Sequence, residues 1–202
     1  MREEVNMDAG LLFYRSRRTS VCEKTIRRAA GWFHLSLGDV RVCTREDRLN
    51  PNMAELLKNA EVVFTISKGD GGCPACAAPL FGTLHVPVGE DGEPVGVLRL
   101  TGRETKGYLV ESEDRAIFIL PDDPSEILEM LPAAFERLKQ KFELEGEIPA
   151  PKDIDFQFSP EKVSEDRIPG QNQTQEQKGG LWEETWMKFE WWKNYCSTRF
   201  RH

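Results

Sequence analysis

The fold is decided by residues 61–76, which read EVVFTISKGDGGCPAC. Residues 61–67 are rich in β-branched and aromatic side chains, which is typical of a buried strand. Residues 68–76 hold three glycines and a proline, which is typical of a turn. A buried strand that runs into such a turn indicates the carboxyl end of a sheet, where open α/β folds bind their ligands.

The segments before this stretch alternate between strand and helix patterns. Short continuous apolar runs are separated by segments whose apolar residues lie at helical spacing. This alternation predicts right-handed βαβ units around a parallel sheet. The expected elements are a strand at 11–14, a helix from Ser20 that ends near Gly38, a strand at 40–44 and a short helix that starts at Pro51.

The segments after this stretch have another pattern. Glycines separate three short extended runs, at 95–100, 107–110 and 116–120, which predict antiparallel additions to the sheet. Pro124 then opens a long helix whose apolar residues recur every three or four positions. We therefore predict a three-layer α/β domain over residues 10–145, with a mainly parallel sheet and an antiparallel extension.

The C-terminal part differs from this domain in composition. Residues 146–180 are poor in apolar side chains, which predicts a disordered polar linker. Residues 181–202 hold four of the five tryptophans, at a spacing that predicts an amphipathic helical tail. Such a helix must cover its aromatic face on its own domain, on a second copy of the chain or on another protein. We expect a homo-oligomer or a protein partner through residues 181–202.

Charge and composition exclude several classes of function. The net charge of -7 argues against a nucleic-acid or membrane partner, because such partners bind clustered lysine and arginine. The cations within residues 15–28 are interpreted as the solvated face of a helix and its leading loop. No stretch is apolar enough to span a bilayer or to form a secretory signal, which predicts a cytoplasmic protein. Five scattered cysteines do not suggest a disulfide framework.

Two stretches resemble a known family. Residues 107–130, GYLVESEDRAIFILPDDPSEILEM, and residues 59–69, NAEVVFTISKG, resemble the molybdopterin-binding-like domain, in the version found at the N-terminus of CinA proteins. The resemblance covers about residues 10–143. It implies a molybdopterin-binding-like fold, a pterin or nucleotide phosphate as ligand, and a role in molybdenum-cofactor metabolism.

The chain departs from this family at three places. Residues 71–76 stand where the family continues through glycines and a threonine to a pair of aspartates. Residues 15–20 replace an acidic turn, and Asp122 replaces a glycine. The acidic residue with which the family handles its ligand therefore has no match here.

The glycine-rich turn is the first candidate for a binding site. Its glycines can adopt positive φ and expose backbone N–H groups to a phosphate, whereas a plain tight turn is the alternative. The turn is neither a P-loop nor a dinucleotide fingerprint. The expected ligand-binding residues are Lys68, Gly69, Asp70, Gly71 and Gly72.

Asp122 and Asp123 form a second candidate. They precede the last helix, where carboxylates suit the positive end of the helix dipole. Capping is one interpretation of this pair. Contact with the ligand or with a divalent ion is the other.

Cys73 and Cys76 form a Cys-x-x-Cys motif at a turn that should precede a helix. A helix N-terminus would activate the first thiol, so zinc binding and dithiol redox chemistry are both open. Cys43 and His85 are conceivable further zinc ligands, and His34 is interpreted as a packed or surface side chain of a helix.

Three functions follow from these features. The first is binding of a small phosphorylated ligand, with molybdopterin or a nucleotide as the cofactor. The second is a non-catalytic interaction module that uses residues 181–202. The third is a small zinc or redox protein centred on Cys73 and Cys76.

Overall fold

The computed structural model describes residues 7–147, so the tail expected at 181–202 and nearly all of the expected linker lie outside the described residues. Within this range helices and strands follow one another as the sequence predicts. The elements are β1 (Met7–Tyr14), α1 (Thr19–Gly31), β2 (Leu35–Cys43), α2 (Glu46–Asn59), β3 (Val62–Ser67), β4 (Gly69–Asp70), β5 (Cys73–Pro74), α3 (Ala77–Leu84), β6 (Leu98–Thr101), β7 (Lys106–Glu111), β8 (Ala116–Pro121) and α4 (Pro124–Phe142).

The main sheet has six strands in the order β2-β1-β3-β8-β7-β6. The first four strands of this order are parallel, β7 pairs antiparallel with β8, and β6 pairs antiparallel with β7. The predicted α/β class, with a mainly parallel sheet and an antiparallel extension, is confirmed.

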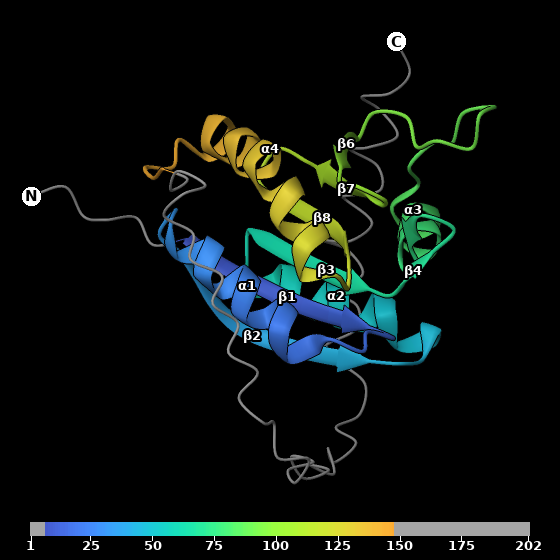
Figure 1. Cartoon of the computed structure of the whole chain (residues 1–202), viewed down its shortest axis with the longest axis horizontal. Helices are drawn as coiled ribbons and strands as arrows, with labels where there is room; N and C mark the ends of the chain where they lie inside the picture. The colour runs from blue at the N-terminus through green and yellow to red at the C-terminus, as the bar shows by residue number, and fades with distance from the viewer. Residues whose placement is uncertain (1–6, 148–202) are drawn as a thin grey trace, which may run out of the picture.

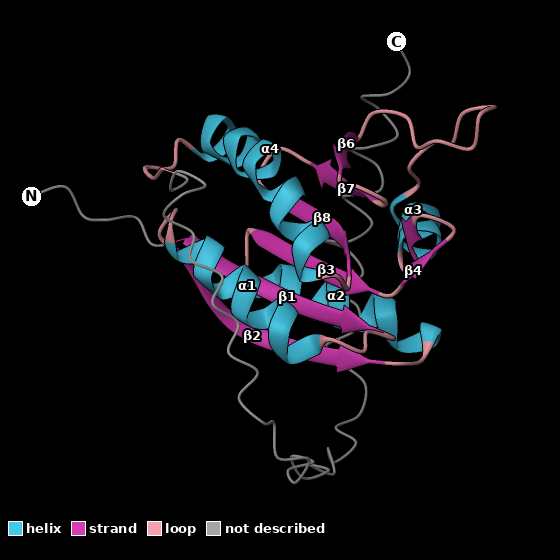
Figure 2. Cartoon of the chain, viewed as in Figure 1, coloured by secondary structure: helices cyan, strands magenta, loops and turns pink. Residues whose placement is uncertain are grey.

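Three layers follow from where the apolar side chains point. Helices α1 and α4 cover one face of the sheet, and α2 and α3 cover the other (Figures 1 and 2). On the first face Phe33 stacks on Phe135, with ring centroids 4.4 Å apart, and Phe64 stacks on Phe118 at 4.9 Å. Among the described helices none is both long and apolar enough to cross a membrane.

Two predicted helix boundaries are wrong. The first helix ends at Gly31 and not near Gly38, because the chain turns at His34, which has a φ of 56°, and enters β2 at Leu35. His34 therefore lies between helix and strand, not on a helix. The second helix begins at Glu46, and Pro51 lies inside it.

The strand order defines a topological switch point. The chain leaves β1 toward β2 on one side, and it later leaves β3 toward β8 on the other side. The connections that follow β1 and β3 therefore diverge at the carboxyl ends of these two strands, which is where the crevice of an open α/β sheet is expected. Ligands of open α/β sheets bind in such a crevice.

Candidate functional site

The parallel strands end level with one another. Tyr14 of β1 is the register partner of Cys43 in β2 and of Ser67 in β3, and Ser67 is the partner of Pro121 in β8. The loops that follow these strands therefore form one continuous surface. We call it the carboxyl edge, and it consists of residues 15–18, 68–76 and 122–123.

The glycine-rich turn is a short β-hairpin. Strands β4 and β5 pair antiparallel, and the two residues between them, Gly71 and Gly72, have φ values of 57° and 83°. A two-residue hairpin turn of type I′ requires positive φ at both positions, which is why glycines occupy them. The tight turn considered as the alternative is thus present, and phosphate binding by this loop stays a prediction.

The hairpin is held by its surroundings. The backbone N–H of Ala75 donates to the carbonyl of Lys68 at 2.9 Å, and the N–H of Lys106 donates to the carbonyl of Gly72 at 3.0 Å. These bonds tie the hairpin to itself and to β7. Lys68, the first residue after β3, is exposed.

Helix α1 begins at the carboxyl edge without a side-chain cap and without an acidic residue in its first turn. The N–H groups of that turn carry the positive end of the helix dipole. The exposed residues Arg15, Arg17 and Arg18 precede the helix. Arg15 directly follows β1 and Lys68 directly follows β3, and these two neighbouring strands end in register. The carboxyl edge therefore carries four cations and the three carboxylates of Asp70, Asp122 and Asp123, a small excess of positive charge in a chain whose net charge is -7.

Asp122 and Asp123 hold the edge together. One carboxylate oxygen of Asp122 accepts the backbone N–H of Arg17 at 3.0 Å. Asp123 is the N-cap of α4: its Oδ1 accepts the N–H of Ser125 at 3.0 Å, and its Oδ2 pairs with Arg18. The hydroxyl of Ser125 also donates to Oδ1 of Asp123, and this bond is the largest cause of the lowered pKa of Asp123. Asp123 thus caps α4, whereas no side chain caps the first turn of α1. Both carboxylates nevertheless lie near the start of α1, where they add to the burial that raises the pKa of Cys22.

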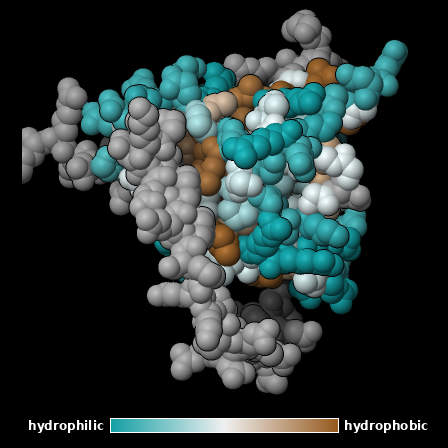
Figure 3. Space-filling view, in the orientation of Figure 1, coloured by the Kyte–Doolittle hydropathy of each residue, from teal (hydrophilic) through white to brown (hydrophobic). Residues whose placement is uncertain are grey.

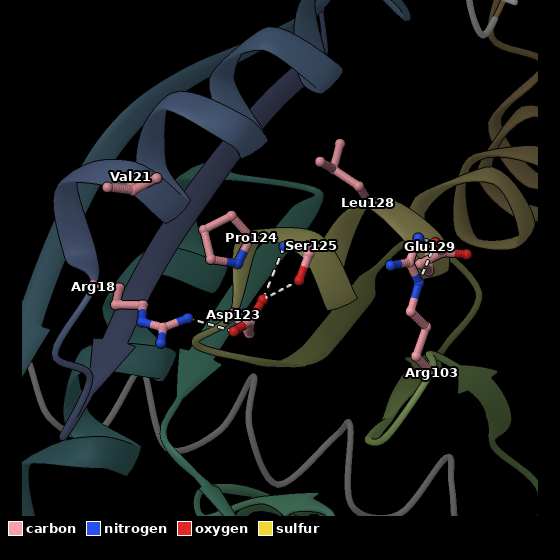
Figure 4. Close-up of a pocket in the computed structure, with 8 residues that line it drawn as sticks. All are labelled: Arg18, Val21, Arg103, Asp123, Pro124, Ser125, Leu128 and Glu129. Atoms are coloured by element: carbon pink, nitrogen blue, oxygen red, sulfur yellow. Dashed lines mark hydrogen bonds and ion pairs between the residues drawn. The ribbon is translucent and has the colours of Figure 1, made fainter. Parts of the chain in front are cut away.

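A pocket of about 510 Å³ lies between the N-terminal turns of α1 and α4 (Figure 4). Arg18 and Arg103 stand on opposite sides of it, and Arg103 pairs with Glu129, with Nε and Oε1 2.8 Å apart. The face of the molecule shown in Figure 3 is mostly hydrophilic, with smaller hydrophobic areas. The lining residues are Arg18, Val21, Arg103, Asp123, Pro124, Ser125, Leu128 and Glu129.

The two thiols of the Cys-x-x-Cys motif have separate partners. Cys76 is fully buried, where the hydroxyl of Ser67 donates to its Sγ at 3.1 Å and accepts its N–H at 3.1 Å. Burial raises the pKa of Cys76 to about 12. Cys73 is half-buried, and its Sγ lies 3.5 Å from the hydroxyl oxygen of Tyr108. The motif places one inert thiol and one accessible thiol at the edge.

The expected zinc site gains no support from the part of the chain that the structure describes. Within residues 7–147 no group of three or more His, Cys, Asp or Glu side chains is placed to hold a metal ion. His85 ends α3 while Cys76 precedes it, so the helix separates them by about 12 Å. Structural zinc requires four ligands.

Sequence reasoning missed the importance of the loop after β1. It treated Arg15, Arg17 and Arg18 as solvent-facing residues of a helix and its leading loop, but the strand order brings them to the switch point beside the 68–76 hairpin. The signal was available, because the first βα loop of such a fold borders this crevice. Val21 and Leu128, two of the apolar residues that line the pocket, gave no separate signal in the sequence.

The comparisons with known proteins bear on the fold. The chain matches no protein-family model and no curated protein sequence. Its structure is similar to the crystal structure of the protein CinA, of unknown function, from Thermoplasma acidophilum, with a TM-score of 0.54 and 12% identity over 65% of this chain and 98% of that one. The tungsten cofactor synthesizing protein MoaB from Pyrococcus furiosus gives a TM-score of 0.42 and 13% identity over 68% and 98%. The chain has a CinA-like, molybdopterin-binding-like fold.

Proposed function

We propose that this protein binds a small phosphate-bearing molecule at the carboxyl edge, with the phosphate at the N-terminus of α1. The observation that carries this proposal is the strand order, which puts the uncapped start of α1 and the 68–76 hairpin on the two sides of the switch point. Helix N-termini bind anions through their free N–H groups and dipole.

The charges at the edge fit an anion. Arg17 and Lys68 are exposed, and the chain offers them no ion pair within hydrogen-bond reach among the described residues. Asp122 holds the backbone of Arg17, which fixes the start of α1 without neutralising that side chain. Two unpaired cations and the first-turn N–H groups suit a phosphate group.

The adjoining pocket suits the rest of such a molecule. Its volume of about 510 Å³ lies within the range of small-molecule sites. A flat ring system could contact Val21 and Leu128 while the phosphate stays at the edge. A pterin or nucleotide phosphate has this form, and molybdopterin is the specific case that the sequence resemblance favours. A place in molybdenum-cofactor metabolism rests on that resemblance.

The test is isothermal titration calorimetry at low salt, with pyrophosphate and GTP as separate probes. Arg17→Gln and Lys68→Gln each remove one exposed cation at the edge. Each should weaken binding about tenfold, since a hydrogen bond to a charged group contributes roughly 1.5 kcal/mol. Lys24→Gln is the matched control, because Lys24 is an exposed cation farther along α1.

The outcomes separate two levels of the proposal. Binding of both probes that weakens in the edge variants and not in Lys24→Gln supports the phosphate site. If GTP binds no more tightly than pyrophosphate, the pocket does not hold the ring system. Absence of binding for both probes, or equal weakening in all three variants, contradicts the proposal.

A further inference from the structure

We propose that the tryptophan-rich segment, residues 181–202, covers an apolar patch beside an acidic turn of the same molecule. The patch consists of Val88, Val95 and Leu98. Residues 181–202 thus contact their own domain, not a second copy or another protein. This inference is independent of the ligand site, because no residue of the patch lines the pocket.

Exposed apolar side chains concentrate within residues 88–98. Five large hydrophobic side chains are exposed in the described part of the chain, and three of them are Val88 at 58%, Val95 at 49% and Leu98 at 39%. The other two, Val21 and Val42, stand singly on α1 and β2. Single exposed apolar residues are normal on a protein surface, whereas a group of them marks a contact surface.

The loop between α3 and β6 holds two of these residues on a defined backbone. The N–H of Val95 donates to the carbonyl of Pro87 at 2.8 Å, and Val88 forms an antiparallel bridge with Pro94. The two valines therefore lie on the two arms of one folded loop, and Leu98 begins β6 directly after it. This loop extends outward beyond α3 (Figure 1), so a covering segment can reach it.

The turn at the tip of this loop is acidic. Residues 89–93 read GEDGE, and Glu90 and Asp91 are exposed. Neither forms an ion pair with another residue of the described range, whereas Glu93 pairs with Lys106. Two carboxylates without a counter-charge among the described residues therefore adjoin the apolar patch.

The sequence of residues 181–202 complements both features. Its aromatic residues at helical spacing are Trp182, Trp186, Phe189 and Trp192. The last ten residues, 193–202, contain Lys193, Arg199 and Arg201 and no Asp or Glu. An aromatic face that is followed by three cations fits an apolar patch that adjoins two carboxylates.

The other exposed apolar surfaces lack this complementarity. At the pocket between α1 and α4, and at Val42 of β2, the nearby carboxylates already have partners among the described residues. These pairs are Asp123 with Arg18, Glu129 with Arg103, and Asp39 with Arg41. Neither surface therefore offers a free negative charge to the basic end of the segment.

The chain between the domain and the segment is long enough for this contact. The polar linker that the sequence predicts spans roughly 30 Å, by the scaling of flexible chains. A domain of this size has a radius of gyration of about 14 Å, so all of its surface is within reach. A tether of this length gives an effective concentration near the millimolar range, which favours the same molecule over a second copy.

Cys196 supplies a natural probe, because it follows Trp192 by four positions and shares its predicted helix face. Val88→Cys in the full chain should form a disulfide with Cys196 under mild oxidation, identified by peptide mass spectrometry. Val21→Cys and Val42→Cys, at exposed valines of other surfaces, are the matched controls. The yield at Val88→Cys should exceed theirs about tenfold, because cross-linking follows effective concentration.

The pattern of cross-links decides between the possible contacts. Equal yields at the three positions, including no yield, overturn the proposal, because an undocked segment meets all exposed thiols alike. A higher yield at Val21→Cys or Val42→Cys places the segment on another surface and also overturns it. A disulfide between two chains identifies a second copy as the occupant and contradicts a contact within one molecule.

The charge contribution is tested on the Val88→Cys background. Glu90→Gln with Asp91→Asn should lower the yield of the disulfide about fivefold, as expected for two exposed ion pairs. Glu136→Gln, at an exposed glutamate of α4, should leave the yield unchanged. A yield that the double substitution leaves unchanged contradicts the role of the acidic turn.

Tryptophan fluorescence gives a second readout, because residues 181–202 hold four of the five tryptophans. Acrylamide should quench the variant that combines Val88→Lys and Val95→Lys more strongly than the wild type, whereas Val42→Lys should match the wild type. Far-ultraviolet circular dichroism checks that each variant is folded. Equal quenching of all these proteins contradicts the proposal.

Discussion

Asp123 is expected to stabilise the protein as the cap of α4, and replacing it tests this directly. Asp123→Ala removes the acceptor of the Ser125 and Glu126 N–H groups, at 3.0 and 3.4 Å, together with the ion pair to Arg18. Loss of an N-cap costs about 1 kcal/mol. The ion pair is largely exposed, so it contributes roughly 0.5 kcal/mol.

The sum for Asp123→Ala is about 1.5 kcal/mol, and for a domain of this size that lowers Tm by roughly 5 °C. Asp123→Asn keeps a capping oxygen and loses only the charge, so its cost should stay near 0.5 kcal/mol. Arg18→Gln removes the ion pair alone and should match the asparagine variant. Urea unfolding without added ligand measures all three.

The order of the three losses in unfolding free energy shows whether Asp123 acts mainly as a cap or mainly through its charge. If Asp123→Asn destabilises as much as Asp123→Ala, the charge matters more than the cap, and the capping account fails. If Asp123→Ala leaves the free energy of unfolding unchanged, the carboxylate has no structural role and its interpretation as a ligand residue gains weight.

Three further results are expected. Gly71→Val should cost about 1–2 kcal/mol in urea unfolding because of the positive φ, and Gly71→Asn should cost clearly less. Iodoacetamide should label Cys73 in the native protein but not Cys22 or Cys76, whose pKa burial raises to about 12; peptide mass spectrometry measures this, and fast labelling of either buried thiol refutes it. Burial alone would raise the pKa of Glu126, but bonds from Thr105 and Glu104 outweigh it and lower the pKa. A lowered folded pKa gives stability that is present above the usual glutamate pKa of about 4.3 and lost as pH falls through the folded pKa. The free energy of unfolding of Glu126→Gln should therefore depend less on pH than that of the wild type between about pH 5 and 3. Identical pH profiles would contradict this role.

The sequence predicts the order of elements well because apolar periodicity reports burial. The run at 62–67, rich in β-branched and aromatic side chains, is buried along its whole length, as expected for a central parallel strand. Pro124 begins α4, and the run at 116–120 becomes β8. Burial of apolar side chains determines these elements, and the pattern of apolar side chains can be read from the sequence.

The errors have physical causes of another kind. The end of α1 depends on the reversal at His34, a non-glycine residue at positive φ, for which the sequence holds no clear sign. Pro51 suggests a helix start, but the acidic residues Glu46 and Asp47 lie in the actual first turn. Local propensity is weaker than the packing of Leu49 and Met53 into the core.

The candidate site was predicted in part. The loops after β3 and β8 were singled out from their own glycines and aspartates. The loop after β1 was not, because its place beside them depends on the strand order, which sets residues 15 and 68 next to each other. Tyr108, which contacts Cys73 from β7, was likewise brought there by sheet register.

The measurement that tests the central claim most directly is a titration of the 15N-labelled chain with pyrophosphate, followed by two-dimensional NMR. If the phosphate lies at the N-terminus of α1, the amide signals of residues 16–21 and 68–72 shift together and saturate with one dissociation constant. The signals of β2 and of the C-terminal half of α4 stay in place. Shifts confined to other surfaces, or none at the start of α1 at millimolar pyrophosphate, contradict the account.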